Sequence, residues 1–98
     1  MVRVLLAEDH SIVRQGTRLY LESHGVEIIG EATTGREAVE MARQLQPDVV
    51  IMDIHLPELT GVEATRRIRH DNPEIRVLVL TAYDEPAYVH ALLYAGAD

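Results

Sequence analysis

The chain has 98 residues and a formal net charge of −7, and 47% of its residues are hydrophobic. This length predicts a single domain over residues 1–98 with enough apolar material for a core. The negative charge argues against direct binding of nucleic acid or of an anionic membrane surface, and no apolar stretch approaches the roughly 20 residues that cross a bilayer. There is no cysteine, which excludes disulfides and thiolate metal sites and predicts a cytoplasmic location.

Strand-like and helix-like segments alternate from the start of the chain. An apolar run over 2–7 predicts a buried strand. A helix is expected next, ending near Gly25 in a left-handed C-cap. Its apolar residues are spaced to line one face: Ile12, Val13, Gly16, Leu19 and Tyr20. A partly alternating run over 26–32 predicts a second strand with one face less deeply buried.

The central segments carry clear start and stop signals. Thr34 and Glu37 have the spacing of a capping box, which predicts a helix that Pro47 ends. A short apolar run over 49–53 predicts a buried strand that closes on Asp53.

The later segments repeat the same order. Thr60 and Glu63 form a second capping-box pattern before a shorter helix. The strongest strand signal follows over 75–81. Asp84, with Pro86 two residues later, predicts the start of a last helix.

Strict alternation of strands and helices predicts an α/β fold, a doubly wound parallel sheet with right-handed crossovers and helices on both faces. Ligands of such sheets bind beyond the carboxyl ends of the strands. Glu8, Asp9, Asp53 and Thr81 all lie at predicted strand ends, so we expect them to meet at one rim.

The three carboxylates of this rim predict a metal site. Like charges held close together repel, so a cation among them is expected. Oxygen ligands without cysteine favour a hard ion, Mg2+ or Mn2+. Asp53 is either a ligand alone or also a nucleophile that forms an acyl phosphate. Glu8 and Asp9 could instead be acids at a helix N-terminus, although that reading leaves Asp53 unexplained. On position alone, Thr81 is better explained as a strand end and turn cap.

Several motifs stand in order along the whole chain: Glu8-Asp9, the stretch from Asp53 to Pro57 with Gly61 shortly after, Thr81-Ala82, and the stretch from Ala95 to Asp98. Together they resemble the receiver domain of two-component response regulators, most closely those joined to a helix-turn-helix output domain. The resemblance implies a flavodoxin-like receiver fold with strand order 2-1-3-4-5.

The resemblance also implies roles for the residues at the rim. Asp53 would accept a phosphoryl group from a phosphohistidine on a sensor histidine kinase or from a small phosphodonor. Asp9, Asp53 and the backbone carbonyl of His55 would bind Mg2+, and Glu8 would act through water. The Thr81 hydroxyl would move toward the phosphoryl oxygen and reposition the last helix. The chain is therefore expected to be a regulatory phosphoacceptor rather than an enzyme, serving transcription regulation in the full-length protein. A direct imidazole ligand from His10 or His55 is not expected.

One part of the receiver pattern does not match. Receiver domains carry a lysine at the end of a fifth strand, followed by a helix, whereas this chain has no lysine and ends at Asp98. We therefore expect a fold that lacks the fifth strand and helix, with 75–81 as an unpaired edge that favours self-association. The alternative function is a phosphorylation-independent interaction or dimerisation module with a receiver fold. A phosphatase is disfavoured because His55 stands where its second acid is expected.

Overall fold

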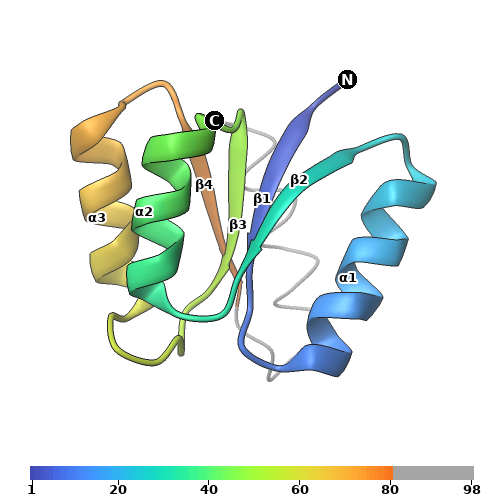
Figure 1. The fold of residues 1–98 in the computed structure, drawn as a ribbon, viewed down its shortest axis with the longest axis horizontal. Coiled ribbons are helices and arrows are strands. Elements are labelled where there is room, and N and C mark those ends of the chain that lie inside the picture. The colour runs from blue at the N-terminus through green and yellow to red at the C-terminus, as the bar shows by residue number, and fades with distance from the viewer. Residues whose placement is uncertain (81–98) are drawn as a thin grey trace.

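The structure is a computed structural model that describes residues 1–80. Thr81 and the helix expected from Asp84 lie outside the described residues. The elements are, in chain order, β1 (Arg3–Ala7), α1 (Ser11–Ser23), β2 (Glu27–Ala32), α2 (Gly35–Leu45), β3 (Val49–Asp53), α3 (Gly61–Asp71) and β4 (Arg76–Leu80) (Figure 1). The predicted alternation of strands and helices is confirmed over this range.

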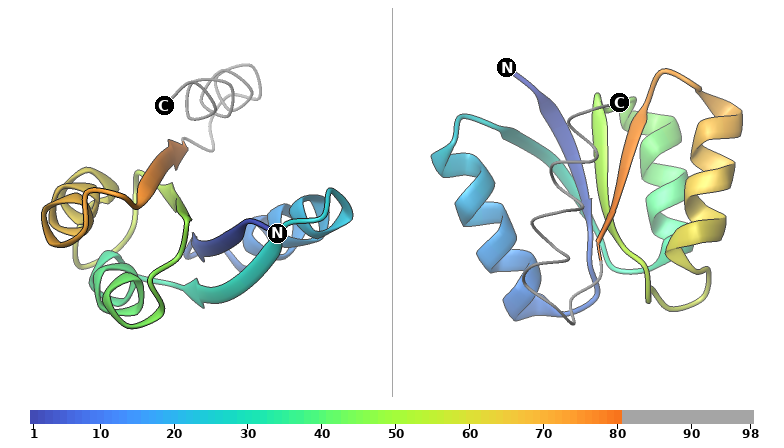
Figure 2. Two further views of the ribbon diagram at one scale, coloured as in Figure 1. Left: turned by 90° about the horizontal axis from the view of Figure 1, so that it is seen from above. Right: turned by 180° about the vertical axis from the view of Figure 1, so that it is seen from behind.

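The four described strands form one parallel sheet in the order β2-β1-β3-β4. This is the predicted order for the first four strands. Helix α1 lies on one face of the sheet, and α2 and α3 lie on the other (Figure 2). In the register, Ala7 at the end of β1 pairs with Ala32 of β2 and with Met52 of β3. The carboxyl ends of the three strands therefore meet at one rim.

Side chains that alternate along the strands form two apolar layers. The layer under α2 and α3 comprises Leu5, Ala7, Ala32, Ala38, Val39, Ala42, Val50, Met52, Leu56, Ala64, Ile68 and Ile75. The smaller layer on the α1 side comprises Val4, Leu6, Ile51 and Leu78. Leu5, Val50 and Met52 are fully buried, and each large apolar side chain buried in this way contributes about 1.5–3 kcal/mol. This packing makes the sheet a rigid support for its rim.

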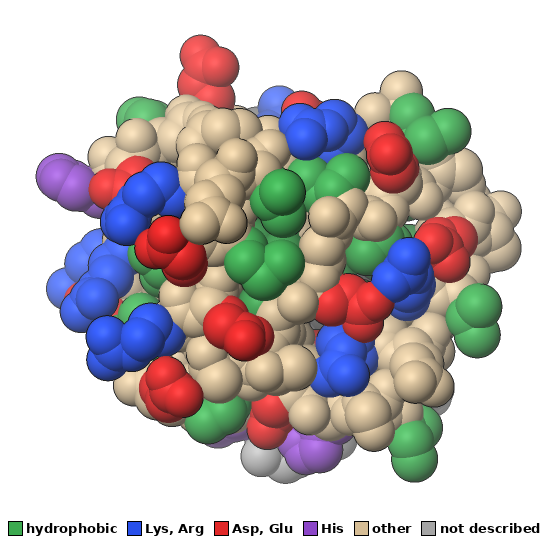
Figure 3. All heavy atoms as spheres, viewed as in Figure 1, with side chains coloured by type: hydrophobic (Ala, Val, Ile, Leu, Met, Phe, Trp, Pro, Cys, Tyr) green, Lys and Arg blue, Asp and Glu red, His purple; other side chains and the backbone are tan. Residues whose placement is uncertain are grey.

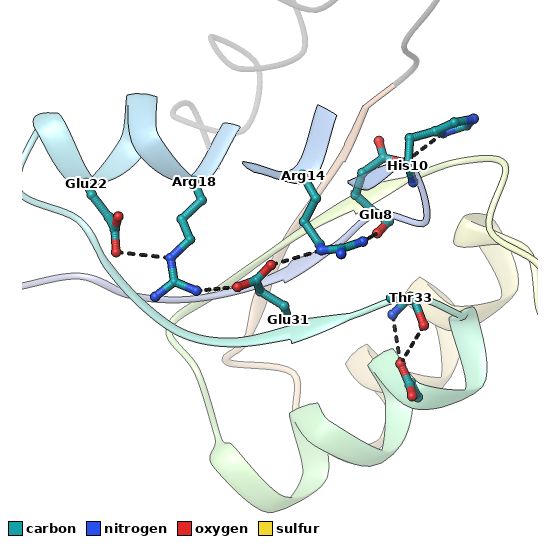
Figure 4. A network of polar contacts seen from close by, with 8 residues as sticks. Glu8, His10, Arg14, Arg18, Glu22, Glu31 and Thr33 are labelled. Atoms are coloured by element: carbon teal, nitrogen blue, oxygen red, sulfur yellow. Dashed lines mark hydrogen bonds and ion pairs between the residues drawn. The ribbon is translucent and has the colours of Figure 1, made fainter. Parts of the chain in front are cut away.

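Helix α1 differs from the sequence prediction in the face that it turns to the sheet. The residues of the predicted apolar stripe are exposed: Ile12, Val13, Gly16, Leu19 and Tyr20. Arg14 and Arg18 are partly buried instead, because both bind the carboxylate of Glu31 on β2 (Figure 4). An ionic network therefore helps to hold α1 against the sheet, together with Leu21, which packs on the smaller apolar layer.

Both predicted capping boxes form only in part. The hydroxyl of Thr34 accepts a hydrogen bond from the backbone N–H of Glu37 (3.0 Å), and Thr60 accepts one from Glu63 (3.2 Å). The Glu37 carboxylate accepts from the backbone N–H (2.7 Å) and the hydroxyl (3.1 Å) of Thr33, and the backbone N–H of Thr34 contributes more weakly. These hydrogen bonds from Thr33 lower the pKa of Glu37. The N-terminus of α2 is thus fixed by Thr34, which caps the helix, and by Thr33, which binds the carboxylate of Glu37.

Candidate metal and phosphoryl site

The predicted acids meet at the carboxyl ends of the two central strands. Glu8 and Asp9 directly follow β1, and Asp53 is the last residue of β3. One ligand atom each from Glu8, Asp9, His10 and Asp53 lie within 4.8 Å of one another. The predicted shared rim is therefore present, and the structure adds one residue to it. Sequence reasoning did not expect the His10 ring there, although its position directly after two acids was the available signal.

Burial divides the cluster into an inner and an outer half. Glu8 and Asp53 are 6% and 4% exposed. The side chains of Asp9 and His10 are 31% and 65% exposed. A ligand approaching from solvent therefore meets the outer pair first, while the inner pair forms the floor.

Backbone amides orient the two inner carboxylates. The N–H of His10 donates to Glu8 Oε2 (3.0 Å), and the N–H of His55 donates to Asp53 Oδ1 (3.1 Å). The amide of Glu8 itself donates to the carbonyl of Ala32 at the end of β2 (3.0 Å). Each inner acid is thus held by the amide two residues further along the chain, and this fixes the direction of its oxygens.

The charges in the cluster shift the protonation of its members. Burial raises the pKa of Glu8, and the nearby charge of Asp53 adds to this rise, whereas hydrogen bonds from His10 oppose it. The pKa of His10 is raised by its hydrogen bond to Glu8 and by the charge of Asp9. The site is thus a concentration of negative charge that a cation would relieve.

An arginine on α1 ties the first acidic loop to the rest of the fold. Arg14 donates through Nη1 to the backbone carbonyl of Glu8 (2.9 Å) and through Nε to Glu31 Oε1 (2.9 Å). Arg18 also binds Glu31 and reaches Glu22 of its own helix (Figure 4). The loop that carries the acids is therefore fixed from β2 and α1 together.

The loop after Asp53 is held closely against the strand ends. The amide of Gly61 donates to the carbonyl of Ile54 (3.0 Å), and the amide of Gly35 donates to that of Pro57 (3.2 Å). A Cβ atom on Gly61 would lie 2.5 Å from the Asp53 carbonyl oxygen. Glycine is therefore required at position 61 by the close approach of α3 to the end of β3.

The structure does not test the predicted roles of Thr81 and of the His55 backbone carbonyl. Thr81 lies outside the described residues. His55 has an exposed side chain, and metal binding by its backbone carbonyl stays a prediction. The residues predicted to bind the metal through side chains, Glu8, Asp9 and Asp53, are brought together.

The surface over α2 and α3 carries charged side chains that are largely paired with one another. Acidic and basic side chains are interspersed on this face rather than gathered by sign (Figure 3). A hollow between the two helices contains Arg36, Arg43 and Arg67. Each of these arginines is paired with an acid, for example Arg43 with Asp71 at 2.9 Å. No helix within residues 1–80 is long and apolar enough to cross a membrane.

Comparison with known protein sequences identifies response regulators as relatives of this chain. The family model for the response regulator receiver domain matches residues 4–98. Response regulator GacA of Pseudomonas viridiflava is 42% identical, over 99% of this chain and 46% of the relative. Response regulator protein VraR of Staphylococcus aureus (strain NCTC 8325 / PS 47) is 41% identical, over 99% of this chain and 47% of the relative. The chain thus spans about half the length of these curated relatives.

The solved structures that resemble this fold are also response regulators. A two-component response regulator of the LuxR family from Aurantimonas sp. SI85-9A1 has a TM-score of 0.81 and 37% identity, covering 98% of this chain and 69% of that one. A DNA-binding response regulator of the LuxR family from Staphylococcus aureus has a TM-score of 0.79 and 29% identity, covering 97% and 80%.

Proposed function

Because the chain belongs to the response regulator receiver domain family, whose members are regulatory domains of two-component signalling rather than enzymes, we propose that Asp53 accepts a phosphoryl group from a phosphohistidine of a sensor kinase. One observation carries this proposal. Carboxylates from the ends of β1 and β3 converge within 4.8 Å at the rim of the sheet, where ligands of open α/β sheets bind.

The donor set suits Mg2+, with Mn2+ as the alternative. Carboxylate oxygens dominate the cluster, and Mg2+ takes one or two carboxylates while keeping waters, which leaves positions for a phosphoryl group. In our proposal Asp9, Asp53 and the His55 carbonyl bind the ion directly, and Glu8 acts through water. When bound, Mg2+ would offset charge on the acceptor and on the phosphoryl oxygens.

The transfer itself requires little movement of the acceptor. An Asp53 carboxylate oxygen forms a bond to phosphorus while the P–N bond of the phosphohistidine breaks, and the imidazole leaves with its electron pair and gains a proton. The amide of His55, already bonded to Asp53 Oδ1 at 3.1 Å, holds the carboxylate in place during the attack. The result is an acyl phosphate on Asp53.

A change at the phosphorylated site must reach a surface to have an effect. We propose that the Thr81 hydroxyl responds to the new phosphoryl oxygens and carries the change to the helix that the sequence predicts from Asp84. In a longer protein this change would control an output domain, and one structural relative is a DNA-binding regulator. Transcription regulation is therefore the proposed outcome of the signal.

The proposal is tested by incubating the chain with acetyl phosphate and Mg2+, followed by mass spectrometry of the intact protein. A single phosphoryl adduct is expected on the wild type and none on Asp53→Asn. Asp48→Asn is the matched control, because Asp48 precedes β3 at the opposite end of the same strand and binds the amide of Arg3. This variant should form the adduct. An unmodified wild type would overturn the proposal and favour the phosphorylation-independent interaction module.

A further inference from the structure

Arg14, near the start of α1, connects the loop after β1 to the neighbouring strand β2. Its guanidinium donates through Nη1 to the backbone carbonyl of Glu8 (2.9 Å) and through Nε to Glu31 Oε1 (2.9 Å) (Figure 4). Only 17% of the side chain is exposed, so water competes little for these two hydrogen bonds. A single side chain thus holds the loop from α1 and from β2 at once.

The carbonyl that Arg14 binds belongs to the peptide between the two acids of the loop. β1 ends at Ala7, and Glu8 is the first residue after it. The amide of Glu8 still donates to the carbonyl of Ala32 (3.0 Å), which continues the pairing of β1 with β2. The carbonyl of Glu8 receives the Arg14 guanidinium. Rotation of this one peptide would redirect the side chains of Glu8 and Asp9 together.

The light packing of α1 adds weight to this contact. In α1, which lies entirely within the described residues 1–80, no residue is buried. Leu21, which packs on the smaller apolar layer, is near the far end of the helix. Little apolar surface therefore fixes the first turn of α1 on the sheet. The hydrogen bonds of Arg14 determine instead where this turn lies relative to the acids.

Arg18, one turn further along α1, shares one of the two contacts of Arg14. It binds the other carboxylate oxygen of Glu31, and it donates to Glu22 Oε2 (3.2 Å). Within residues 1–80 its hydrogen bonds go to these two acids and not to the loop after β1. The two arginines therefore carry the same charge and share one partner, and they differ in the hydrogen bond to Glu8.

We propose that Arg14 is a positioning residue for phosphoryl transfer to Asp53, and that it acts by holding the peptide between Glu8 and Asp9. The inference rests on the proposed function, because it concerns the same site. Outer residues that orient the groups of a site are usually worth about 10–100-fold in activity or metal affinity. Without the guanidinium, the carbonyl of Glu8 turns toward water, and both loop acids lose their fixed orientation toward Asp53. Glu31 supports Arg14 through a charge-assisted hydrogen bond.

Amide hydrogen exchange, measured by NMR on the metal-free chain, tests this positioning directly. The amide of His10 donates to Glu8 Oε2 (3.0 Å), so its exchange rate reports the geometry of the loop. This rate should rise about tenfold in Arg14→Ala, while that of the His55 amide, which binds Asp53 at the end of β3, should change by less than about twofold. Arg18→Ala is the matched control, because it also weakens the ionic network but keeps the hydrogen bond to the loop. It should leave both rates within about twofold of the wild type.

The rate of phosphorylation by acetyl phosphate is the second readout. Arg14→Ala should raise the Mg2+ concentration that gives half the maximal rate by about tenfold. A variant that merely unfolds more easily loses rate in proportion to its folded fraction and keeps the wild-type Mg2+ concentration, as Arg18→Ala should. Circular dichroism confirms that each variant is folded. Arg14→Lys serves as a second variant, since an ammonium keeps the charge but lacks the fork that binds both acceptors, and it should show the same changes.

The outcomes separate the inference from the proposed function. Wild type that forms the phosphoryl adduct, with Arg14→Ala and Arg18→Ala equal in loop exchange and in Mg2+ dependence, would overturn the inference alone. Faster exchange of every strand amide in Arg14→Ala, in step with that of His10, would reduce its role to stability and also overturn the inference. A wild type that forms no adduct would overturn the proposed function, and the inference with it.

Discussion

The two buried carboxylates at the rim should destabilise the metal-free protein, and removing one charge should therefore stabilise it. Glu8 and Asp53 are 6% and 4% exposed, so water screens them little. Their ligand atoms lie within 4.8 Å, and two unit charges at that distance repel by about 3.5 kcal/mol at an effective dielectric constant of about 20. Burial is the main cause that raises the pKa of Glu8, and the charge of Asp53 adds to the rise.

The perturbation is Asp53→Asn, which removes the charge and keeps an oxygen that can accept from the His55 amide. Hydrogen bonds from His10 already relieve some of the repulsion. The expected gain in the free energy of unfolding is therefore about 1–2 kcal/mol at neutral pH without metal. For a chain of this size such a gain raises Tm by roughly 4–16 °C.

Urea denaturation in the presence of a chelator measures this gain, and a second series with Mg2+ completes the assay. Mg2+ should stabilise the wild type, because it binds only the folded state, and should stabilise Asp53→Asn much less. Asp71→Asn is a suitable control, since Asp71 is an exposed acid paired with Arg43 on the other side of the molecule. Its stability should fall slightly or not change. An Asp53→Asn variant no more stable than wild type without metal would refute the reasoning.

Three further predictions concern the parts that hold the site. Gly61→Ala places a Cβ 2.5 Å from a backbone oxygen and should destabilise the fold by about 1–3 kcal/mol in urea denaturation. Gly16→Ala, in open space on α1, should instead stabilise it by about 0.5–1 kcal/mol. Glu31→Gln should lower the free energy of unfolding by about 1–2 kcal/mol, because it weakens the ion pairs with Arg14 and Arg18. Glu27→Gln, at an exposed position of the same strand, should leave stability unchanged. Equal losses in the two variants would show that the ionic network does not stabilise the fold. Hydrogen bonds from Thr33 lower the pKa of Glu37 below its usual value of 4.5. Their contribution to stability is therefore fully present above pH 4.5 and is lost as the pH falls through the lowered pKa. Stability measured from about pH 5 to about pH 3 should therefore fall more steeply in wild type than in Glu37→Gln, and parallel curves would contradict this.

The fold and the acid cluster could be predicted because each depends on simple patterns. Buried parallel strands read as short apolar runs, and parallel strands place their carboxyl ends at one rim. The sequence therefore predicts that Asp53 and the acids after β1 lie together. The helix start at Thr34 followed in the same way, from a local spacing rule.

What could not be predicted depends on side chains from separate elements. The apolar spacing from Ile12 to Tyr20 identified the helix but not its buried face. The orientation of the helix depends on Glu31 of β2, which accepts a hydrogen bond from Arg14 of α1 although the two residues are 17 positions apart in the sequence. The direction of the His10 ring likewise depends on its contacts with Glu8 and Asp9. The spacing of residues along the sequence does not predict such a side-chain rotamer.

The central claim is that Asp53 receives the phosphoryl group, and mapping the modified residue tests it most directly. The chain treated with acetyl phosphate and Mg2+ is reduced with borohydride, which converts an aspartyl phosphate to homoserine, and its peptides are sequenced by tandem mass spectrometry. Homoserine at position 53 alone is the predicted result. Homoserine at Asp9 or another acid, or none at position 53, would contradict the account.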